Sequence, residues 1–142
     1  MPDALRVLFL CTHNSARSQM AEAFLNELGG GRFQAFSAGT EARGLHPLSV
    51  QAMAEEGIDI SLQESKTLDR FANEQFDLMI TVCDEANEAC PYFPNARERL
   101  HWSFPDPSAA VGDDAARFAA FVAVRDAIRD RIERELIALR AR

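Results

Sequence analysis

A cysteine followed at a fixed interval by an arginine is the feature of this sequence best suited to chemistry. Cys11 and Arg17 form a Cys-x5-Arg spacing, and Ser18 follows directly. A cysteine thiolate is a strong nucleophile, and a guanidinium is a planar, permanently charged group that suits a tetrahedral oxyanion. We therefore predict a thiolate nucleophile on the floor of a phosphate-shaped pocket, with a Cys11 thiol that ionises easily. The residues predicted to bind the oxyanion are Thr12, His13, Asn14, Ser15, Ala16, Arg17 and Ser18.

Apolar residues lead directly into this segment, and a helical pattern follows it. The run Val7 to Leu10 is typical of a buried strand, and apolar side chains then recur at helical spacing until the glycines at 29–31. A strand, a tight loop and a helix in this order aim backbone N–H groups and the positive end of the helix dipole into one concavity. Asn14 tolerates the positive φ that such a loop demands. Ser15 is as well suited to capping the helix as to binding an oxyanion.

Strands and helices alternate along the rest of the chain. We predict strands over 33–38, 76–82 and 100–104, a strand-like piece over 58–61, and helices over 47–56 and from a cap at Asp113 or Asp114 onward. This alternation predicts a single α/β domain over 1–142 with a mainly parallel sheet covered on both faces. Ligands bind beyond the carboxyl ends of the strands in such sheets. Because Cys11, Cys83 and Asp106 each follow a predicted strand, we expect them to converge.

Composition excludes several classes of partner. The formal net charge is −7, from 15 basic and 22 acidic side chains, which argues against nucleic acid and anionic membranes. No apolar run is long enough to span a bilayer, and the first residues lack the pattern of a secretion signal. We therefore expect a cytoplasmic protein that captures an anionic ligand through a local field.

The cysteine count bears on disulfides and metals. Three cysteines, at 11, 83 and 90, argue against a structural disulfide framework. Zinc sites usually take about four ligands, with paired cysteines about two to four positions apart. The interval from Cys83 to Cys90 is wider, and the histidines at 13, 46 and 101 are scattered. We predict neither a bound metal nor an organic cofactor.

The loop at 11–18 resembles that of low molecular weight protein tyrosine phosphatases, and the whole chain resembles more closely their redox relatives, the thioredoxin-coupled arsenate reductases. The shared motifs are Cys-Thr-x-Asn-Ser-x-Arg-Ser-Gln-Met-Ala-Glu at 11–22, Ser-Ala-Gly at 37–39, Ile-Asp-Ile-Ser at 58–61, Val-Cys-x6-Cys-Pro at 82–91, His-Trp-x-Phe at 101–104, Asp-Pro at 106–107 and Val-Arg-Asp-x-Ile at 124–128. The resemblance implies a three-layer sandwich, with a mainly parallel four-stranded sheet and helices on both faces.

The resemblance also implies a disulfide relay. In the family mechanism, Cys11 attacks arsenate while Arg17 neutralises its oxygens and Asp106 protonates the leaving oxygen. Cys83 then attacks Cys11 and expels arsenite, and Cys90 attacks Cys83. Thioredoxin reduces the resulting disulfide, although glutathione with glutaredoxin or another small thiol stays open as the reductant.

Two other functions stay open on the sequence alone. A tyrosine phosphatase needs one thiolate, an arginine and an acid, and has no use for Cys83 and Cys90. The phosphatases also carry a cysteine where this chain has Ala16, and aromatic residues where it has 108–110. An oxyanion-binding redox sensor is the third possibility. The cysteine pair as two unrelated thiols, and Asp106 as an ordinary turn aspartate, are the simplest alternatives.

Some arsenate reductases bind potassium beside the loop, and this chain departs from their pattern. Asn14, Glu22 and Ser37 match the ligand positions, but Lys66 stands where those enzymes have an aspartate. We predict that the Lys66 ammonium replaces the cation and pairs with Glu22, which gives weak or absent potassium dependence.

Overall fold

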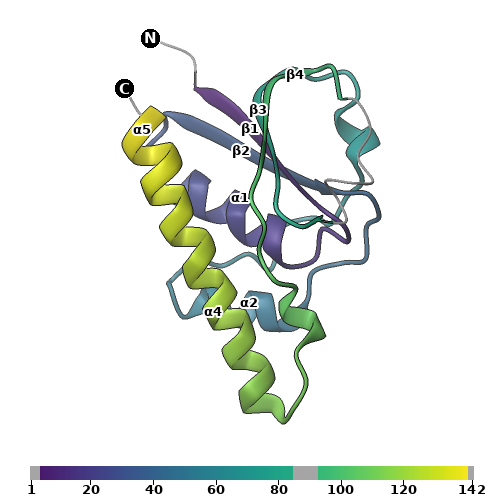
Figure 1. Ribbon diagram of the computed structural model, residues 1–142, viewed down its shortest axis with the longest axis vertical. Helices are drawn as coiled ribbons and strands as arrows, with labels where there is room; N and C mark the ends of the chain where they lie inside the picture. Colours follow the sequence, from purple (N-terminus) through teal and green to yellow (C-terminus); the bar gives the residue numbers. More distant parts are fainter. Residues whose placement is uncertain (1–3, 85–92, 141–142) are drawn as a thin grey trace.

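The computed structural model describes residues 4–84 and 93–140, so Cys90 lies outside the described residues. The elements in chain order are β1 (Leu5–Cys11), α1 (Arg17–Leu28), β2 (Phe33–Gly39), α2 (Pro47–Ala54), the 3-10 turn η1 (Leu68–Phe71), β3 (Phe76–Thr81), β4 (Ala96–His101), the 3-10 turn η2 (Pro107–Ala109), α4 (Asp114–Ile132), the π-helical turn η3 (Glu133–Ile137) and α5 (Ala138–Arg140). Figure 1 shows their arrangement.

The sheet has four parallel strands in the order β2-β1-β3-β4. β1 lies between two neighbours, and its Val7 pairs with Ala35 on one side and with Leu78 on the other. Leu8 and Phe9 are completely buried, as expected for a parallel strand that is covered on both faces. The buried run before Cys11 is therefore the centre of the sheet.

Helices and turns cover the two faces of this sheet. α1 and α4 pack side by side against one face (Figure 1), where Phe9 contacts Trp102 with ring centroids 6.2 Å apart. Ser37 of β2 pairs with Phe9 and shares its face of the sheet. Its neighbour Phe36 therefore points to the opposite face. There it meets Phe71 of η1 at 5.8 Å. The three-layer α/β architecture is confirmed.

Two predicted strands differ from the structure. Residues 58–61 form no strand; the Ile58 N–H donates to Met53 O at the end of α2, and Ile60 is a fully buried anchor of a loop. The last strand covers 96–101 and not 100–104. It is an edge strand with exposed charged side chains at 97–99, so no run of apolar residues marks it in the sequence.

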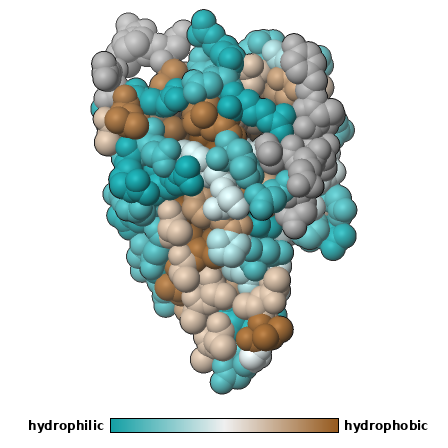
Figure 2. All heavy atoms as spheres, viewed as in Figure 1, coloured by the Kyte–Doolittle hydropathy of each residue, from teal (hydrophilic) through white to brown (hydrophobic). Residues whose placement is uncertain are grey.

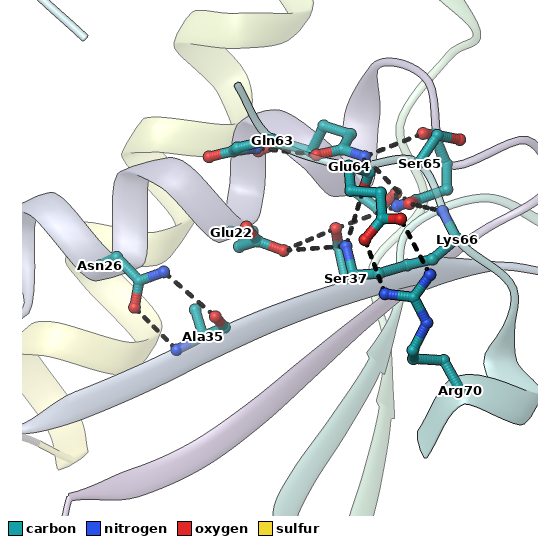
Figure 3. Close-up of polar contacts among 12 residues, drawn as sticks. Glu22, Asn26, Ala35, Ser37, Gln63, Glu64, Ser65, Lys66 and Arg70 are labelled. Atoms are coloured by element: carbon teal, nitrogen blue, oxygen red, sulfur yellow. Dashed lines mark hydrogen bonds and ion pairs between the residues drawn. The ribbon is translucent and has the colours of Figure 1, made fainter. Parts of the chain in front are cut away.

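The other edge strand, β2, has its backbone covered by a side chain. Asn26 of α1 accepts a hydrogen bond from Ala35 N–H at 2.8 Å and donates one to Ala35 O at 3.1 Å (Figure 3). These are groups that an edge strand otherwise presents to solvent.

Hydrophilic and apolar side chains are unevenly distributed over the face drawn in Figure 2. Figure 2 shows hydrophilic side chains over most of the visible face, with apolar ones gathered toward the end where α4 begins. Among the described residues, no helix is both long enough and apolar enough to cross a bilayer.

Candidate active site

The loop between β1 and α1 lies at the carboxyl end of the central strand. Cys11 is the last residue of β1 and is 3% exposed, and Arg17 is the first residue of α1. Ala16 occupies the N-cap position, and no side chain caps the helix. The idea that Ser15 serves as the cap is therefore wrong. The uncapped first turn leaves its N–H groups available to an anion.

The carbonyl groups of the loop are held from outside. Backbone N–H groups of Thr40, Glu41, Arg43 and His46 donate to the carbonyls of Cys11, Thr12, His13 and Ser15, over 2.8–3.2 Å. In a trans peptide the C=O group and the next N–H group point in opposite directions. Engaging the carbonyls on the outer side therefore turns N–H groups inward, and the Thr12 N–H does reach the Cys11 thiol.

Gly39 allows this outer loop to come close. A Cβ atom at position 39 would lie 2.8 Å from Thr12 O and 2.9 Å from Asn14 N. Real Cβ atoms essentially never make contacts this short. Only glycine therefore fits where β2 passes close to the loop at 11–18, which we call the anion loop.

Asn14 locks the loop from the inside. It is the one non-glycine residue with positive φ, 49°, among the described residues. Its Nδ2 donates to Ser18 Oγ at 2.8 Å and Ser37 Oγ at 3.0 Å, and its Oδ1 accepts from Lys66 N–H and Gln19 Nε2, both at 2.9 Å. All of its amide capacity is used. Sequence reasoning found the backbone requirement at this position but missed the network.

Ser49 is another residue that sequence reasoning missed. It is completely buried, and its hydroxyl lies 3.1 Å from Ser15 O and 2.7 Å from His46 O. His46 caps α2, accepting from Leu48 N–H at 3.1 Å. The start of α2 thus braces the anion loop. The only signal was Pro47, which marked a helix start without showing what that helix touches.

Cys83 meets Cys11 although 72 positions separate them in the sequence. Cys83 is fully buried just beyond β3, and its side chain is hydrogen-bonded to that of Cys11. Thr12 Oγ1 lies 3.2 Å from Cys83 Sγ. Neither thiol is oxidised. The predicted convergence of strand ends is confirmed for this pair, while Cys90 lies outside the described residues.

The expectation that the Cys11 thiol ionises easily is wrong for the site without a ligand. The pKa of Cys11 is raised, first by its hydrogen bond with Cys83 and then by burial. The charge of Arg17 and the Thr12 N–H lower it, but they do not compensate. The sequence showed the groups that lower the pKa, whereas the opposing thiol comes from a distant strand.

Asp106 and Arg17 face each other across the site. The Asp106 carboxylate lies 3.9 Å from the Arg17 guanidinium, which also donates to Phe104 O at 3.0 Å. Burial favours a higher pKa for Asp106, but hydrogen bonds from Ser108 and the charges of Arg17 and His13 outweigh it, so the pKa is lowered. Asp106 is therefore ionised at neutral pH when no oxyanion is bound.

Lys66 lies where the sequence placed it, beside Glu22. Its Nζ is 3.7 Å from Glu22 Oε1, which accepts from Ser37 Oγ at 2.8 Å (Figure 3). Burial is the largest influence on both groups: it raises the pKa of Glu22 and lowers the pKa of Lys66. Within the described ranges, no cluster of three or more His, Cys, Asp or Glu side chains is arranged to hold a metal ion.

Comparisons with known proteins agree with this geometry. Residues 6–142 match the family model described as low molecular weight phosphotyrosine protein phosphatase. An arsenate reductase of Halalkalibacterium halodurans is 46% identical over 127 residues, which are 89% of this chain and 91% of that protein.

Two solved structures extend the comparison. An arsenate reductase in the phosphate-binding state is 35% identical, with a TM-score of 0.79 over 94% of this chain and 97% of that one. A thioredoxin-dependent arsenate reductase of Corynebacterium glutamicum is 28% identical, with a TM-score of 0.67 over 92% of this chain and 61% of that one. The matched family model, which covers the loop, the sheet and the final helices, shows that the chain belongs to the low molecular weight phosphotyrosine protein phosphatase family.

Proposed function

We propose that this protein reduces arsenate to arsenite, with Cys11 as the nucleophile. The observation that carries the proposal is the Cys83 thiol hydrogen-bonded to Cys11 inside the anion loop. Phosphate ester hydrolysis needs one thiolate, whereas a two-electron reduction needs a second thiol to form a disulfide. The relatives named arsenate reductases support the same assignment.

In the first step the Cys11 thiol gives its proton to an oxygen of the bound oxyanion and its sulfur forms a bond to arsenic; that oxygen leaves as water once it has received a second proton. The inward N–H groups of the loop and the Arg17 guanidinium neutralise the remaining oxygens. An arriving oxyanion places negative charge beside Asp106, which raises the pKa of that carboxyl. Asp106 then carries a proton and delivers it to the leaving oxygen.

In the second step the Cys83 thiol gives its proton to an oxygen on arsenic, and its thiolate attacks Cys11 Sγ. The electron pair of the S–As bond stays on arsenic, which leaves as arsenite, and the two thiols are oxidised to a disulfide. The Thr12 hydroxyl, 3.2 Å from Cys83 Sγ, is placed to donate a hydrogen bond to the attacking thiolate.

In the third step Cys90 attacks Cys83, which frees Cys11 and leaves a Cys83–Cys90 disulfide for a thioredoxin-type reductant. The name of the Corynebacterium relative supports this reductant. Bridged cysteines have Cα atoms within about 7 Å, whereas seven residues of regular helix rise about 10.5 Å. Cys83 and Cys90 therefore cannot be joined across regular helix. Thioredoxin would meet this enzyme in the cytoplasm, where thiols are kept reduced.

A coupled assay tests the proposal. NADPH oxidation with arsenate is followed with thioredoxin and its reductase, and in parallel with glutathione and glutaredoxin. We expect sustained turnover with thioredoxin, none for Cys11→Ser, and a single round of arsenite release for Cys90→Ala. Sustained thioredoxin-coupled turnover by Cys90→Ala would overturn the relay.

Phosphatase activity is the second candidate, favoured by the family match and the loop geometry. It predicts hydrolysis of p-nitrophenyl phosphate that survives in Cys83→Ala. Hydrolysis without arsenate reduction by either reductant system would favour a phosphatase, and reversible oxidation without either activity would favour a redox sensor.

A further inference from the structure

We propose that His101 is a positioning residue that holds the chain on both sides of Cys83 and so fixes how the Cys83 thiol meets Cys11. The proposal rests on the proposed function for its place in the reaction, but its geometry stands independently. The two hydrogen-bond partners of its side chain, Thr81 and Asp84, lie outside the anion loop.

Both ring nitrogens of His101 are engaged. Nδ1 lies 2.8 Å from Thr81 Oγ1, and Nε2 lies 2.8 Å from Asp84 Oδ1. Thr81 is the last residue of β3, and Asp84 directly follows Cys83. One rigid imidazole thus bridges the residues that bracket Val82 and Cys83.

The contacts of His101 restrain the chain beyond the point where the backbone hydrogen bonds of the sheet end. Backbone hydrogen bonds hold the chain through Val82: its N–H donates to Leu10 O at 2.9 Å, and its carbonyl accepts from Phe104 N–H at 3.3 Å. Thr81 and His101 form the last register pair of β3 and β4. The Asp84–His101 contact carries the restraint past Cys83.

This contact is poorly placed to serve global stability. The Asp84 side chain is 68% exposed and that of His101 is 31% exposed. Exposed ion pairs contribute little to folding because water competes for both partners. Even a weak contact can still affect the rate if it fixes the direction of a buried thiol. A misplacement of about 1 Å costs up to about 100-fold in rate.

The bridge is available in either protonation state of the ring. A neutral ring with its proton on Nε2 donates to Asp84 and accepts from the Thr81 hydroxyl at Nδ1. A protonated ring donates to both, and the Thr81 hydroxyl can turn to Leu100 O, 3.4 Å away. Other groups that face the pair are Ser103, which is hydrogen-bonded to Asp84, and the charge of Arg17. The bridge should therefore act across neutral pH.

The test isolates disulfide formation from arsenate chemistry. In a Cys90→Ala background, Cys11 and Cys83 are the remaining thiols, and diamide accepts two electrons from them as their disulfide forms. We expect His101→Ala to slow this cross-linking about tenfold, while phosphate affinity, measured by protection of Cys11 from iodoacetamide, stays within about twofold. Glu98→Gln is the matched control, because Glu98 lies on the same strand as His101 and its exposed ion pair is with Arg140 of α5.

Three further variants make the outcome decisive. His101→Gln retains a donor near the position of Nε2 and should restore much of the rate at every pH from 6 to 8. Asp84→Ala should slow cross-linking as His101→Ala does, and the double variant should be no slower than either. Because Asp84 is exposed, its variant should fold even if His101→Ala does not.

Parent-like cross-linking in folded His101→Ala or Asp84→Ala would overturn the inference. So would an equal loss of phosphate affinity, which would place the effect in the anion loop. Failure of the proposed function is a separate result, because the wild-type protein would then release no arsenite while the diamide rates remained measurable.

Discussion

Cys11 shares its buried site with a second thiol, that of Cys83, and this neighbour opposes the loss of a proton from Cys11. The hydrogen bond between Cys11 and Cys83 is the largest influence that raises the pKa of Cys11, ahead of burial. This ties the two halves of the proposed reaction together, since the partner that later attacks Cys11 also keeps the nucleophile neutral in the site without a ligand.

Removing Cys83 should therefore lower the pKa of Cys11. We expect Cys83→Ala to shift the pH profile of Cys11 alkylation by iodoacetamide to lower pH, in a Cys90→Ala background. Cys83→Ser keeps a hydrogen-bonding group and should shift it less. An unchanged profile in Cys83→Ala would show that burial, and not the second thiol, controls Cys11.

Lys66 should make the enzyme indifferent to potassium. We propose that its ammonium, 3.7 Å from Glu22, occupies the place of a cation. Activity in potassium and sodium chloride of equal ionic strength should then agree within about twofold, because screening is matched. Lys66→Asp restores a carboxylate and should create potassium stimulation. Strong stimulation of the unaltered protein by potassium would contradict the proposal.

The Glu22–Lys66 pair also predicts a pH-dependent stability. Both side chains are mostly buried, so Lys66→Met leaves an uncompensated carboxylate and should cost about 2 kcal/mol in the free energy of unfolding at pH 8. The pKa of Glu22 is already raised, and loss of Lys66 removes an influence that lowers it. A carboxyl with a raised folded-state pKa favours folding at low pH, and this contribution is lost as pH rises through that pKa.

Urea unfolding from pH 5 to 8 checks this sign. The deficit of Lys66→Met relative to wild type should shrink toward pH 5, and adding Glu22→Gln should remove most of it at pH 8. A deficit that is independent of pH would assign the loss to packing and not to charge.

The anion loop depends on contacts with neighbouring secondary-structure elements for its conformation. β2 passes beneath the anion loop at Gly39, and the start of α2 supports it through Ser49 and His46. The order of strand, loop and helix was predictable from the sequence because apolar periodicity and glycines mark those boundaries. The braces were not, because they depend on which carbonyl meets which donor across the fold.

Gly39→Ala tests the closest of these contacts. The added Cβ would press on the carbonyl oxygen of Glu41, whose N–H holds the Thr12 carbonyl, and on Thr12 O and Asn14 N, so we expect phosphate affinity to fall at least about tenfold. Gly57→Ala is the control: its φ of +74° makes alanine strained, but no atom lies near the added Cβ. If both variants lose stability and neither loses phosphate affinity, the contact at Gly39 does not shape the site.

Across the molecule, what the sequence revealed depends on burial. The central strand and the helix α4 were predictable, because a continuous apolar run and apolar residues at helical spacing each indicate an element that is covered by others. The predicted position of the edge strand β4 was wrong. A strand that pairs on one side only can carry solvent-facing charges, and these charges give no apolar pattern that locates it. Residues 58–61 alternate like a strand, yet the alternation reflects only the burial of Ile60 in a loop.

The predicted site shows the same division. Cys11, Arg17 and Asn14 follow from a local pattern, and the strand ends predicted the meeting with Cys83. The pKa of Cys11 and the positions of His46, Ser49 and His101 depend on contacts between segments far apart in the chain. No local pattern encodes these contacts.

The two hydrogen bonds between Asn26 and the backbone of Ala35 also bear on how copies of this protein coexist in a crowded solution. An edge strand with open N–H and C=O groups is a template on which another chain can add a strand. We expect Asn26→Ala to scatter more light during prolonged incubation at high concentration, with little change in the coupled assay. By occupying the open backbone groups of β2, the Asn26 side chain should therefore limit the self-association of the folded protein.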